Sequence, residues 1–452
     1  MTQVFCISAG QKTTKKTDHV IHRRNRYLNY GLLSLATILN DSGIRSRQIQ
    51  GNFDSPVSVF DRCLDLGMAE SRFPVLVSIP SFYAVSWANE FNELIKSRLP
   101  EKRIIVGGRW VVDGQLSEMK QLVPLADDVI SGTAESIIYN LVCGNNNYEQ
   151  RIVLGGAQFH LNYELLEDRA LYQPSIEISR GCGMGCSFCQ EKSEPLTKLK
   201  PANNVVGEVR ETLLFDGLNP MNLYFEASMF TPNETWIRSL IESREKHGVD
   251  FHWRTEARVD SVHPRHLNAL YASGLRVLDL GLESADPTQL KRMNKTSNPE
   301  KYLARASELI EQAYAAGIAV KVNILLFAGE TEASIVRTRA WLEKHRHAIT
   351  GVSVGPVIVF GWPKRVAHYL SELASFGANI SHSPVAGVVH LNLSPEIDYY
   401  RSIELSAEIG KDFTTSSDYF FLKSFSYFSR DYTEHSFMLD CEATEHQLNF
   451  SL

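Results

Sequence analysis

Ser179-Arg-Gly-Cys-Gly-Met-Gly-Cys-Ser-Phe-Cys-Gln190 holds three cysteines in a C-x3-C-x2-C spacing. The preceding run, Ser175-Ile-Glu-Ile-Ser179, alternates apolar and polar residues, which predicts that the cysteines lie on a loop leaving a strand. Three thiolates at this spacing can bind one face of a cubic [4Fe–4S] cluster, because the intervening glycines let the backbone turn tightly. We therefore predict that Cys182, Cys186 and Cys189 are cluster ligands and that one iron is left for another group.

Three other interpretations of these cysteines fit the sequence less well. A zinc site needs four ligands, and no fourth Cys or His lies near the segment in the sequence. Unrelated buried thiols would not cluster, whereas three of the seven cysteines lie within eight residues. A non-catalytic iron–sulfur protein, such as an electron carrier or sensor, would require a fourth cluster ligand. The cluster with one open iron is the interpretation that we keep.

The motif, with the aromatic Phe188 before its third cysteine, resembles the signature of the radical S-adenosylmethionine (SAM) enzymes. The resemblance implies that SAM chelates the open iron through its amino and carboxylate groups. It further implies that the reduced cluster cleaves SAM to a 5′-deoxyadenosyl radical, which abstracts hydrogen from a small-molecule substrate. An electron donor such as flavodoxin or ferredoxin is the expected partner. No catalytic residue beyond the cluster is assigned.

From the cysteine segment onward, strands alternate with helices, which predicts a partial (β/α)6 barrel of the TIM type over residues 175–380. In such a barrel the functional residues gather at the carboxyl ends of the strands. The strands that we expect are Ser175–Ser179, Asn222–Glu226, Phe251–Glu256, Val277–Leu282, Ala319–Phe327 and Val352–Val359.

Several candidate SAM-binding residues lie at these strand ends. Glu226 precedes Ala227 and Ser228, which stand where related enzymes often carry acids. Arg258 lies in a segment similar to the R-V-D pattern of one subclass, and it could bind a carboxylate or pair with Asp260.

Two further pairs complete the predicted SAM site. Glu283 and Ser284 resemble the family's G-x-E-S segment, in which a carboxylate can accept from two ribose hydroxyls. Lys321 and Asn323 alternate with apolar residues, so both face one side of their strand. Burial against the helices would be costly for these polar groups, which favours the barrel interior.

Residues 1–150 predict a Rossmann-like, doubly wound domain, because strands and helices alternate there as well. Gly107, Gly108 and Gly132 follow two of its strands, where such folds bind ligands. The order of elements resembles the cobalamin-binding domain of a large radical SAM subclass, although the D-x-H-x-x-G motif of other cobalamin domains is missing. Either these glycines contact cobalamin or the domain is a scaffold that has lost it.

Two segments carry no motif. Residues 151–174 are interpreted as a linker, and residues 381–452 as a small, aromatic-rich C-terminal extension. In this extension Asp418–Arg430 is expected to form strands or a lid that packs against the barrel core. The alternative to this packing role is that Tyr419, Tyr427 and Arg430 help to form the substrate pocket.

The composition of the chain limits the binding partners and the cellular location that we expect. The chain has 452 residues, 44% of them hydrophobic, and a net charge of −6, which argues against broad nucleic-acid binding. No apolar run resembles a signal peptide or a membrane span, so a cytoplasmic protein is expected.

The reaction that we predict is cobalamin-dependent methylation of an unactivated carbon in specialised metabolism. The alternative is a cobalamin-independent lyase, dehydratase or rearrangement enzyme with a vestigial cobalamin domain.

Overall fold

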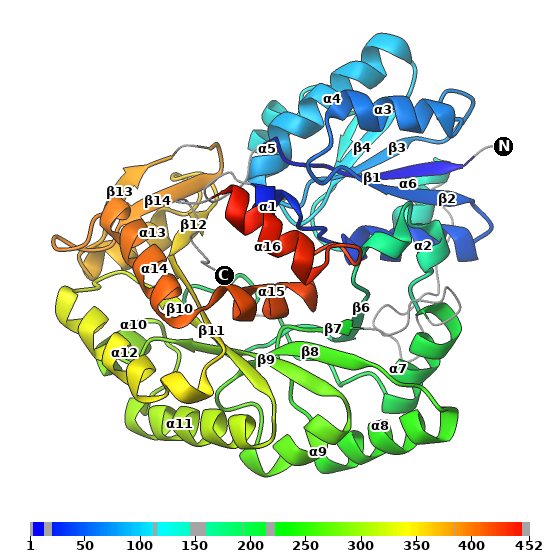
Figure 1. The fold of residues 1–452 in the computed structure, drawn as a ribbon. Helices are drawn as coiled ribbons and strands as arrows, with labels where there is room; N and C mark the ends of the chain where they lie inside the picture. The colour runs from blue at the N-terminus through cyan, green and yellow to red at the C-terminus, as the bar shows by residue number, and fades with distance from the viewer. Residues whose placement is uncertain are drawn as a thin grey trace. The chain divides into compact units, whose positions relative to one another are not determined.

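The computed structural model describes residues 3–12, 20–111, 115–144, 160–192, 194–213, 222–383 and 385–444 (Figure 1). The chain divides into two units, which are described separately. The first contains Met1–Tyr172 and Ser429–Tyr432, and the second contains Gln173–Phe428 and Thr433–Leu452. In the described ranges, no helix combines the length and the apolar composition that crossing a membrane requires.

The first unit contains a parallel sheet of five strands in the order β2-β1-β3-β4-β5. Because β1 lies between β2 and β3, the direction of winding reverses at β1, as in doubly wound folds. The carboxyl ends of β1 and β3 therefore flank the position where such folds bind ligands. The strands are β1 Val4–Ser8, β2 Ser46–Gln50, β3 Val75–Ser78, β4 Ile104–Gly107 and β5 Asp128–Val129.

Helices cover both faces of this sheet (Figure 1). On one face, Cys6 and Leu76 of the strands pack against buried residues of α2 and α6. On the other face lie α3 and α4, which contact each other through Phe60 and Phe91, with ring centroids 6.3 Å apart. The helices are α1 Val20–Arg23, α2 Tyr30–Asp41, α3 Pro56–Asp65, α4 Val85–Arg98, α5 Leu116–Leu122 and α6 Ile138–Cys143.

Strand β2 is unusual because it is polar and yet buried. Gln48 is fully buried and Gln50 is 4% exposed. Their amide groups donate to the carbonyls of Asn29 and Tyr27, at 3.1 and 2.7 Å. The segment that leads into α2 therefore accepts from the amide N–H groups of both glutamines, whereas the buried Gln48 amide oxygen has no hydrogen-bond partner among the described residues.

A short segment near the C-terminus also belongs to the first unit. The backbone N–H groups of Ser429 and Arg430 donate to the carbonyls of Arg24 and Leu171, at 3.2 and 3.0 Å. The Arg24 guanidinium lies 5.1 Å from the ring centre of Tyr432. Ser429–Tyr432 is therefore part of the first unit, although the residues on both sides of it belong to the second.

The second unit contains six parallel strands in sequential order, from β6 to β11, which form a partial barrel. Its helices lie on the convex side of the curved sheet (Figure 1). The strands are β6 Ser175–Ser179, β7 Asn222–Ala227, β8 His252–Arg258, β9 Leu275–Glu283, β10 Ala319–Leu326 and β11 Gly351–Pro356. The helices are α7 Ala202–Glu208, α8 Glu234–His247, α9 Leu267–Ala272, α10 Pro287–Arg292, α11 Pro299–Ala315 and α12 Glu332–Lys344. The predicted fold class, a doubly wound domain followed by a partial barrel, is confirmed.

One predicted strand, Val352–Val359, is wrong in its extent. It divides into β11 and β12 Ile358–Phe360, which belong to different sheets. Pro356 lacks a backbone N–H and ends the parallel pairing. Strand β12 instead pairs antiparallel with β14 Val388–Asn392, which also pairs with β13 Asn379–His382.

The predicted strands within Asp418–Arg430 are also wrong, because most of this segment is helical. Helix α15 Ser416–Ser424 begins after Thr415, whose hydroxyl accepts from the backbone N–H of Asp418. It lies between α14 Tyr399–Phe413 and α16 Glu434–Ala443. Leu422 and Phe425 pack against Val277 and Ala319 of the barrel strands, so the segment covers the concave side of the sheet (Figure 1).

Candidate functional site

The cysteine loop leaves β6 in a conformation that depends on glycine. Gly181, Gly183 and Gly185 all have positive φ angles, of 71°, 66° and 72°. A Cβ atom on Gly181 would lie 2.1 Å from the carbonyl oxygen of Pro195, so no other residue fits there without moving the backbone. The Cys182 N–H donates to the carbonyl of Glu194 at 2.9 Å, which closes the loop on itself.

A second segment, just after α10, holds the far side of the loop. The Ser187 N–H donates to the carbonyl of Met293 at 2.9 Å. The Asn294 side chain donates to the carbonyl of Gly185 at 2.8 Å, and Asn294 itself has a left-handed backbone, with φ 50°. The cysteines are therefore fixed by hydrogen bonds from both sides before any ligand binds.

The three thiols differ in their surroundings. Cys186 is buried, whereas Cys182 and Cys189 are half-buried. The Cys182 sulfur lies 3.6 Å from the thioether sulfur of Met229. Burial raises the pKa of Cys189, and the negative charges of Glu191, Cys186 and Cys182 raise it further, although a backbone hydrogen bond at Glu191 opposes them. The pKa of Cys189 therefore responds to both of the other thiols.

Arg258, at the end of β8, contacts the cysteine loop directly. Its Nη1 donates to the Cys186 sulfur at 2.9 Å. Its Nε and Nη2 donate to the two carboxylate oxygens of Asp260, at 2.9 and 3.1 Å. Nη2 also donates to the carbonyl of Lys295 at 2.8 Å. Of the two roles that the sequence left open for Arg258, the pairing with Asp260 is present in the structure.

Glu283 ends β9 in a strained conformation close to the same segment. Its φ is 69°, which is rare for a residue with a side chain and marks a position held by its surroundings. One carboxylate oxygen accepts from Lys295 Nζ at 2.9 Å. The other oxygen is available to a ligand at the carboxyl end of the barrel.

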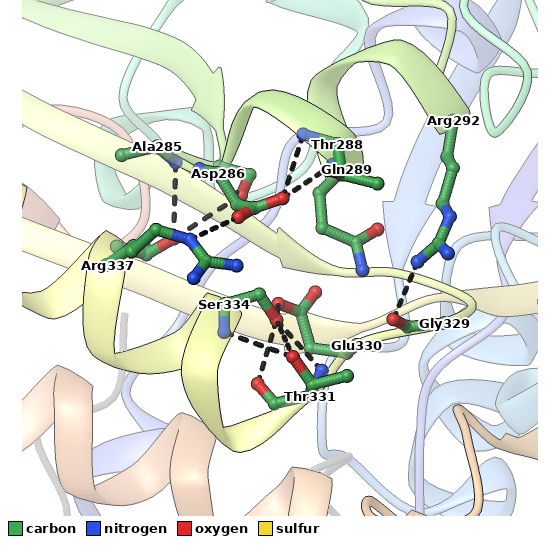
Figure 2. Close-up of polar contacts among 12 residues, drawn as sticks. Ala285, Asp286, Thr288, Gln289, Arg292, Gly329, Glu330, Thr331, Ser334 and Arg337 are labelled. Atoms are coloured by element: carbon green, nitrogen blue, oxygen red, sulfur yellow. Dashed lines mark hydrogen bonds and ion pairs between the residues drawn. The ribbon is translucent and has the colours of Figure 1, made fainter.

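Ser284, which was predicted beside Glu283 in the SAM site, has a structural environment. It is 2% exposed, and its hydroxyl accepts from the Asp286 N–H at 3.0 Å and contacts the Thr338 hydroxyl at 3.3 Å. Asp286 in turn caps α10 by accepting from the N–H groups of Thr288 and Gln289, as Figure 2 shows. Ser284 therefore shapes the turn that carries Glu283.

The barrel interior contains a layer of charged side chains from neighbouring strands. In the sheet register, Asp279 lies beside Glu256 on one side and beside Lys321 on the other. Asp279 is fully buried and pairs with Arg254, which is 1% exposed, and with Lys321 at 3.5 Å. Burial raises the pKa of Asp279, but the charges of Arg254 and Lys321 outweigh this and lower it. Lys321 thus has a structural partner in the interior, the side that its alternation predicted.

Glu226 and Glu256 belong to the same layer but form no ion pair with any residue that the structure describes. Glu226 accepts only from the Ser175 hydroxyl, at 2.9 Å, and burial raises its pKa to about 8. Glu256 is accessible to solvent, yet desolvation by the surrounding protein and the charge of Asp279 raise its pKa. Glu256 is not among the predicted site residues, although Arg254, Glu256 and Arg258 alternate along β8 and must share its inner face. Asn323 pairs with Gly281 in the next layer toward the carboxyl end.

Comparisons with known proteins bear on this arrangement. Residues 176–342 match the sequence profile of the radical SAM superfamily. The chain carries a radical SAM domain. The cysteine loop and the strand ends described above lie within the matched residues, and enzymes of the radical SAM superfamily use a [4Fe–4S] cluster and SAM.

Individual relatives match only part of the chain. The chain is 27% identical to the ribosomal protein uS12 methylthiotransferase RimO of Kineococcus radiotolerans over 185 residues, which are 39% of this chain and 38% of that protein. It is 24% identical to the GTP 3′,8-cyclase of Nitrobacter winogradskyi over 188 residues, 40% of this chain and 52% of that one. The match thus spans about half or less of these relatives.

Solved structures extend the similarity to the first unit. The radical SAM methyltransferase TsrM of Kitasatospora setae, solved with its tryptophan substrate and a SAM analogue, has a TM-score of 0.65. It is 16% identical, and the similarity covers 93% of this chain and 90% of TsrM. OxsB, solved with aqua-cobalamin and SAM, has a TM-score of 0.57 at 15% identity, covering 92% of this chain and 62% of OxsB. The two units together therefore have the fold of these enzymes.

The cysteine loop of the radical SAM domain fits a cubic cluster better than a single metal ion. Among the described residues, no three His, Cys, Asp or Glu side chains converge on a point where one ion could bind. Thiolates that bind three different irons of a cluster do not need to converge in this way. The loop instead presents three free thiols on a glycine-rich turn that hydrogen bonds fix from both sides.

The predicted glycines of the first unit lie at the carboxyl edge of its sheet. Gly108 has φ 108°, and a Cβ atom there would lie 2.7 Å from the backbone of Ile79, so internal packing already explains this glycine. Gly107 ends β4, and Gly132 follows β5. Between β1 and β3, the Asn29 side chain donates to the hydroxyls of Ser8 and Ser78, both at 3.0 Å. The edge is therefore polar where doubly wound folds bind ligands.

Proposed function

We propose that this radical SAM enzyme transfers a methyl group to an unactivated carbon of a small molecule, with cobalamin as the methyl carrier. The observation that carries the proposal is the fold similarity to TsrM, which spans 93% of the chain and includes both units. A cobalamin-dependent reaction would require a doubly wound unit in addition to the radical SAM domain. This chain has both.

We assign the cluster to Cys182, Cys186 and Cys189. When bound and reduced, the cluster supplies the electron that cleaves SAM to a 5′-deoxyadenosyl radical able to take hydrogen from carbon. The contribution of the chain is to hold three thiolates in place. The glycine turn and the hydrogen bonds with Met293 and Asn294 hold the loop that carries them.

For SAM, we propose contacts with the free oxygen of Glu283, with Asn323 and with Glu226. Glu283 and Asn323 lie toward the carboxyl ends of adjacent strands, where ligands of barrel enzymes bind. Lys321 and Ser284, which the sequence also indicated, have partners within the protein, so we assign them supporting roles. Arg258 is considered separately below.

For cobalamin, we propose the carboxyl edge of the first sheet, where Ser8, Ser78 and the turns at Gly107, Gly108 and Gly132 lie. Cobalamin, when bound, would carry the methyl group between SAM and the substrate. The hydroxyls of Ser8 and Ser78 accept from Asn29, so the O–H group of each can still donate to a ligand. Small residues at this edge leave the backbone accessible to a bulky ligand.

The substrate class and the redox partner are part of the proposal. We expect a small molecule that enters the barrel interior beside Glu226 and Glu256, and a one-electron donor such as a flavodoxin or a ferredoxin. At pH 7 a carboxyl group with a pKa of about 8, such as that of Glu226, is mainly protonated and can donate a hydrogen bond.

An anaerobic reconstitution tests the proposed function. The full chain is loaded with iron and sulfide, mixed with hydroxocobalamin, and desalted. Its visible spectrum and iron content are then measured, and 5′-deoxyadenosine is assayed after addition of SAM and reductant. We expect cluster absorbance, retained cobalamin and formation of 5′-deoxyadenosine.

The outcomes separate the candidate functions. Failure to form a cluster would contradict the whole proposal. A cluster and 5′-deoxyadenosine without retained cobalamin would contradict methyl transfer through cobalamin and would favour a lyase, dehydratase or rearrangement enzyme. A variant with Cys182, Cys186 and Cys189 all changed to Ala should lose both the cluster spectrum and the nucleoside product.

A further inference from the structure

Arg258 is the one guanidinium for which the structure gives a hydrogen bond to a cluster cysteine in the described part of the chain. Its Nη1 lies 2.9 Å from the Cys186 sulfur. The side chain of Arg258 is 8% exposed, and Cys186 is 6% exposed. The contact is therefore shielded from water, where a hydrogen bond to a charged group has a large effect.

The guanidinium is held in a single orientation. Asp260 accepts from Nε and Nη2, and the carbonyl of Lys295 accepts a second bond from Nη2. Four of the five N–H groups are thus used, counting the bond to Cys186. The two-pronged face that could bind a carboxylate of SAM is occupied by Asp260.

The carbonyl of Lys295 links Arg258 to the rest of the site. Lys295 also donates from Nζ to Glu283, and the residue before it, Asn294, donates to Gly185 of the cysteine loop. The segment that orients Arg258 is therefore the same segment that fixes the loop. Arg258 and the loop that carries Cys186 are consequently both hydrogen-bonded to Asn294 or Lys295, which are adjacent in the chain.

We propose that Arg258 is a positioning residue that sets the reduction potential of the cluster by donating a hydrogen bond to the Cys186 thiolate. The inference rests on the proposed function, because it assumes that Cys186 is a cluster ligand. Asp260 and the Lys295 carbonyl are the groups that aim the guanidinium at the sulfur.

The physical reason is the charge that the cluster gains on reduction. In the one-electron step from the 2+ to the 1+ state, an external reductant supplies the electron and no covalent bond changes. A hydrogen bond and a positive charge at a cysteine sulfur stabilise the reduced state more than the oxidised state, which raises the potential. Removal of the donor therefore makes the cluster harder to reduce.

Redox titration followed by electron paramagnetic resonance, without SAM, tests this directly. The full chain is reconstituted anaerobically as wild type, Arg258→Gln, Arg258→Lys and the control Arg292→Gln. Arg292 carries the same charge and its carbonyl contacts Ser187, but its Nη1 donates to the carbonyl of Gly329 at 2.7 Å (Figure 2). Arg292→Gln thus removes a nearby charge without removing a bond to sulfur.

We expect the midpoint potential of Arg258→Gln to shift to more negative values than that of the wild type. Arg258→Lys keeps the charge but cannot bind Asp260 and Cys186 together, so it should also shift in the negative direction, by less. Arg292→Gln should shift by a small fraction of the Arg258→Gln value. An unchanged potential in Arg258→Gln at full iron content would overturn the proposal.

The remaining outcomes are also informative. Equal shifts in Arg292→Gln and Arg258→Gln would overturn the proposal, because they would indicate a general charge effect. Failure of both Arg258 variants to retain iron, with Arg292→Gln loaded normally, would also overturn it in favour of a structural role. Absence of a cluster in every protein, wild type included, would instead contradict the proposed function.

Discussion

At the scale of single residues, Gly181 is the position where the cysteine loop tolerates least change. Its φ is 71°, and an added Cβ atom would lie 2.1 Å from the Pro195 carbonyl oxygen. Gly183 also has a positive φ, but an added Cβ atom there would lie 3.6 Å from the nearest heavy atom, the Glu194 carbonyl oxygen. An alanine at position 183 would therefore cause backbone strain alone, whereas an alanine at position 181 would cause a steric clash as well.

We expect Gly181→Ala to lose most of the iron that the reconstituted wild type retains, because the Cys182 backbone must move. Gly183→Ala should retain more iron, since it carries only the strain of a left-handed alanine, about 1–2 kcal/mol. Iron and sulfide content per chain measure the difference. Equal retention by both variants would show that the contact with Pro195 does not matter.

Glu226 leads to a prediction about pH. Its folded-state pKa is raised by burial to about 8 from the ordinary value of 4.5. The folded protein therefore binds a proton that the unfolded chain releases, so stability falls as the pH rises from about 4.5 to about 8. Glu226→Gln should remove this loss and gain up to about 4 kcal/mol relative to wild type across that range.

Urea unfolding of the reconstituted protein at several pH values measures this gain. Glu177→Gln, which changes a carboxylate on the neighbouring strand that pairs with Arg180, is the control for a general charge effect. If the curves of Glu226→Gln and wild type stay parallel from pH 5 to 8, the raised pKa is wrong.

At the scale of elements, the concave side of the barrel depends on a buried ion pair that also anchors the chain beyond β11. Arg254 pairs with Asp279, and its Nη1 donates to the Leu422 carbonyl of α15 at 2.7 Å and to the Ser426 hydroxyl at 2.9 Å. Asp279 therefore supports α15 indirectly, through Arg254.

We expect Asp279→Asn to destabilise the protein by about 3–5 kcal/mol, because it leaves Arg254 and Lys321 buried without a countercharge. Ser426→Ala removes one neutral acceptor and should cost about 1 kcal/mol. Urea midpoints under anaerobic conditions compare the two. Similar losses in both variants would contradict the importance of the pair.

Sequence patterns predicted elements well where hydrophobic periodicity was clear, as for β6, β7 and β10. They missed β2, because its buried residues are glutamines whose partners lie in the segment before α2. They misassigned α15, whose many aromatic residues favour strands, because its packing on Val277 is a long-range contact. Local preference cannot indicate such contacts.

The candidate site shows the same limit. The cysteines followed from spacing alone, and the interior position of Lys321 followed from strand alternation. The bond from Arg258 to Cys186 joins residues far apart in the sequence, and the partners of Ser284 and Lys321 are contributed by other strands and helices. The sequence identified the residues, but it could not show which protein groups form hydrogen bonds or ion pairs with their polar atoms.

At the scale of the whole molecule, the two proposed cofactor sites belong to separate units. The cysteines lie in the second unit, whereas Ser8, Ser78 and Gly108 lie in the first. We therefore expect the variant with Cys182, Cys186 and Cys189 changed to Ala to lose iron but to bind hydroxocobalamin with a Kd within about twofold of wild type, or ~0.4 kcal/mol.

Absorbance titration or calorimetry measures this Kd, and circular dichroism checks that the variant is folded. A folded triple variant that no longer binds cobalamin would contradict independent sites.

The return of Ser429–Tyr432 to the first unit has a consequence for recombination. A chimera that exchanges residues 1–172 with those of a relative would leave behind a four-residue segment in which Ser429 and Arg430 bond to Arg24 and Leu171 of the original unit. A single crossover therefore cannot transfer this unit intact. Swaps intended to alter its cofactor preference should carry the second, distant segment as well.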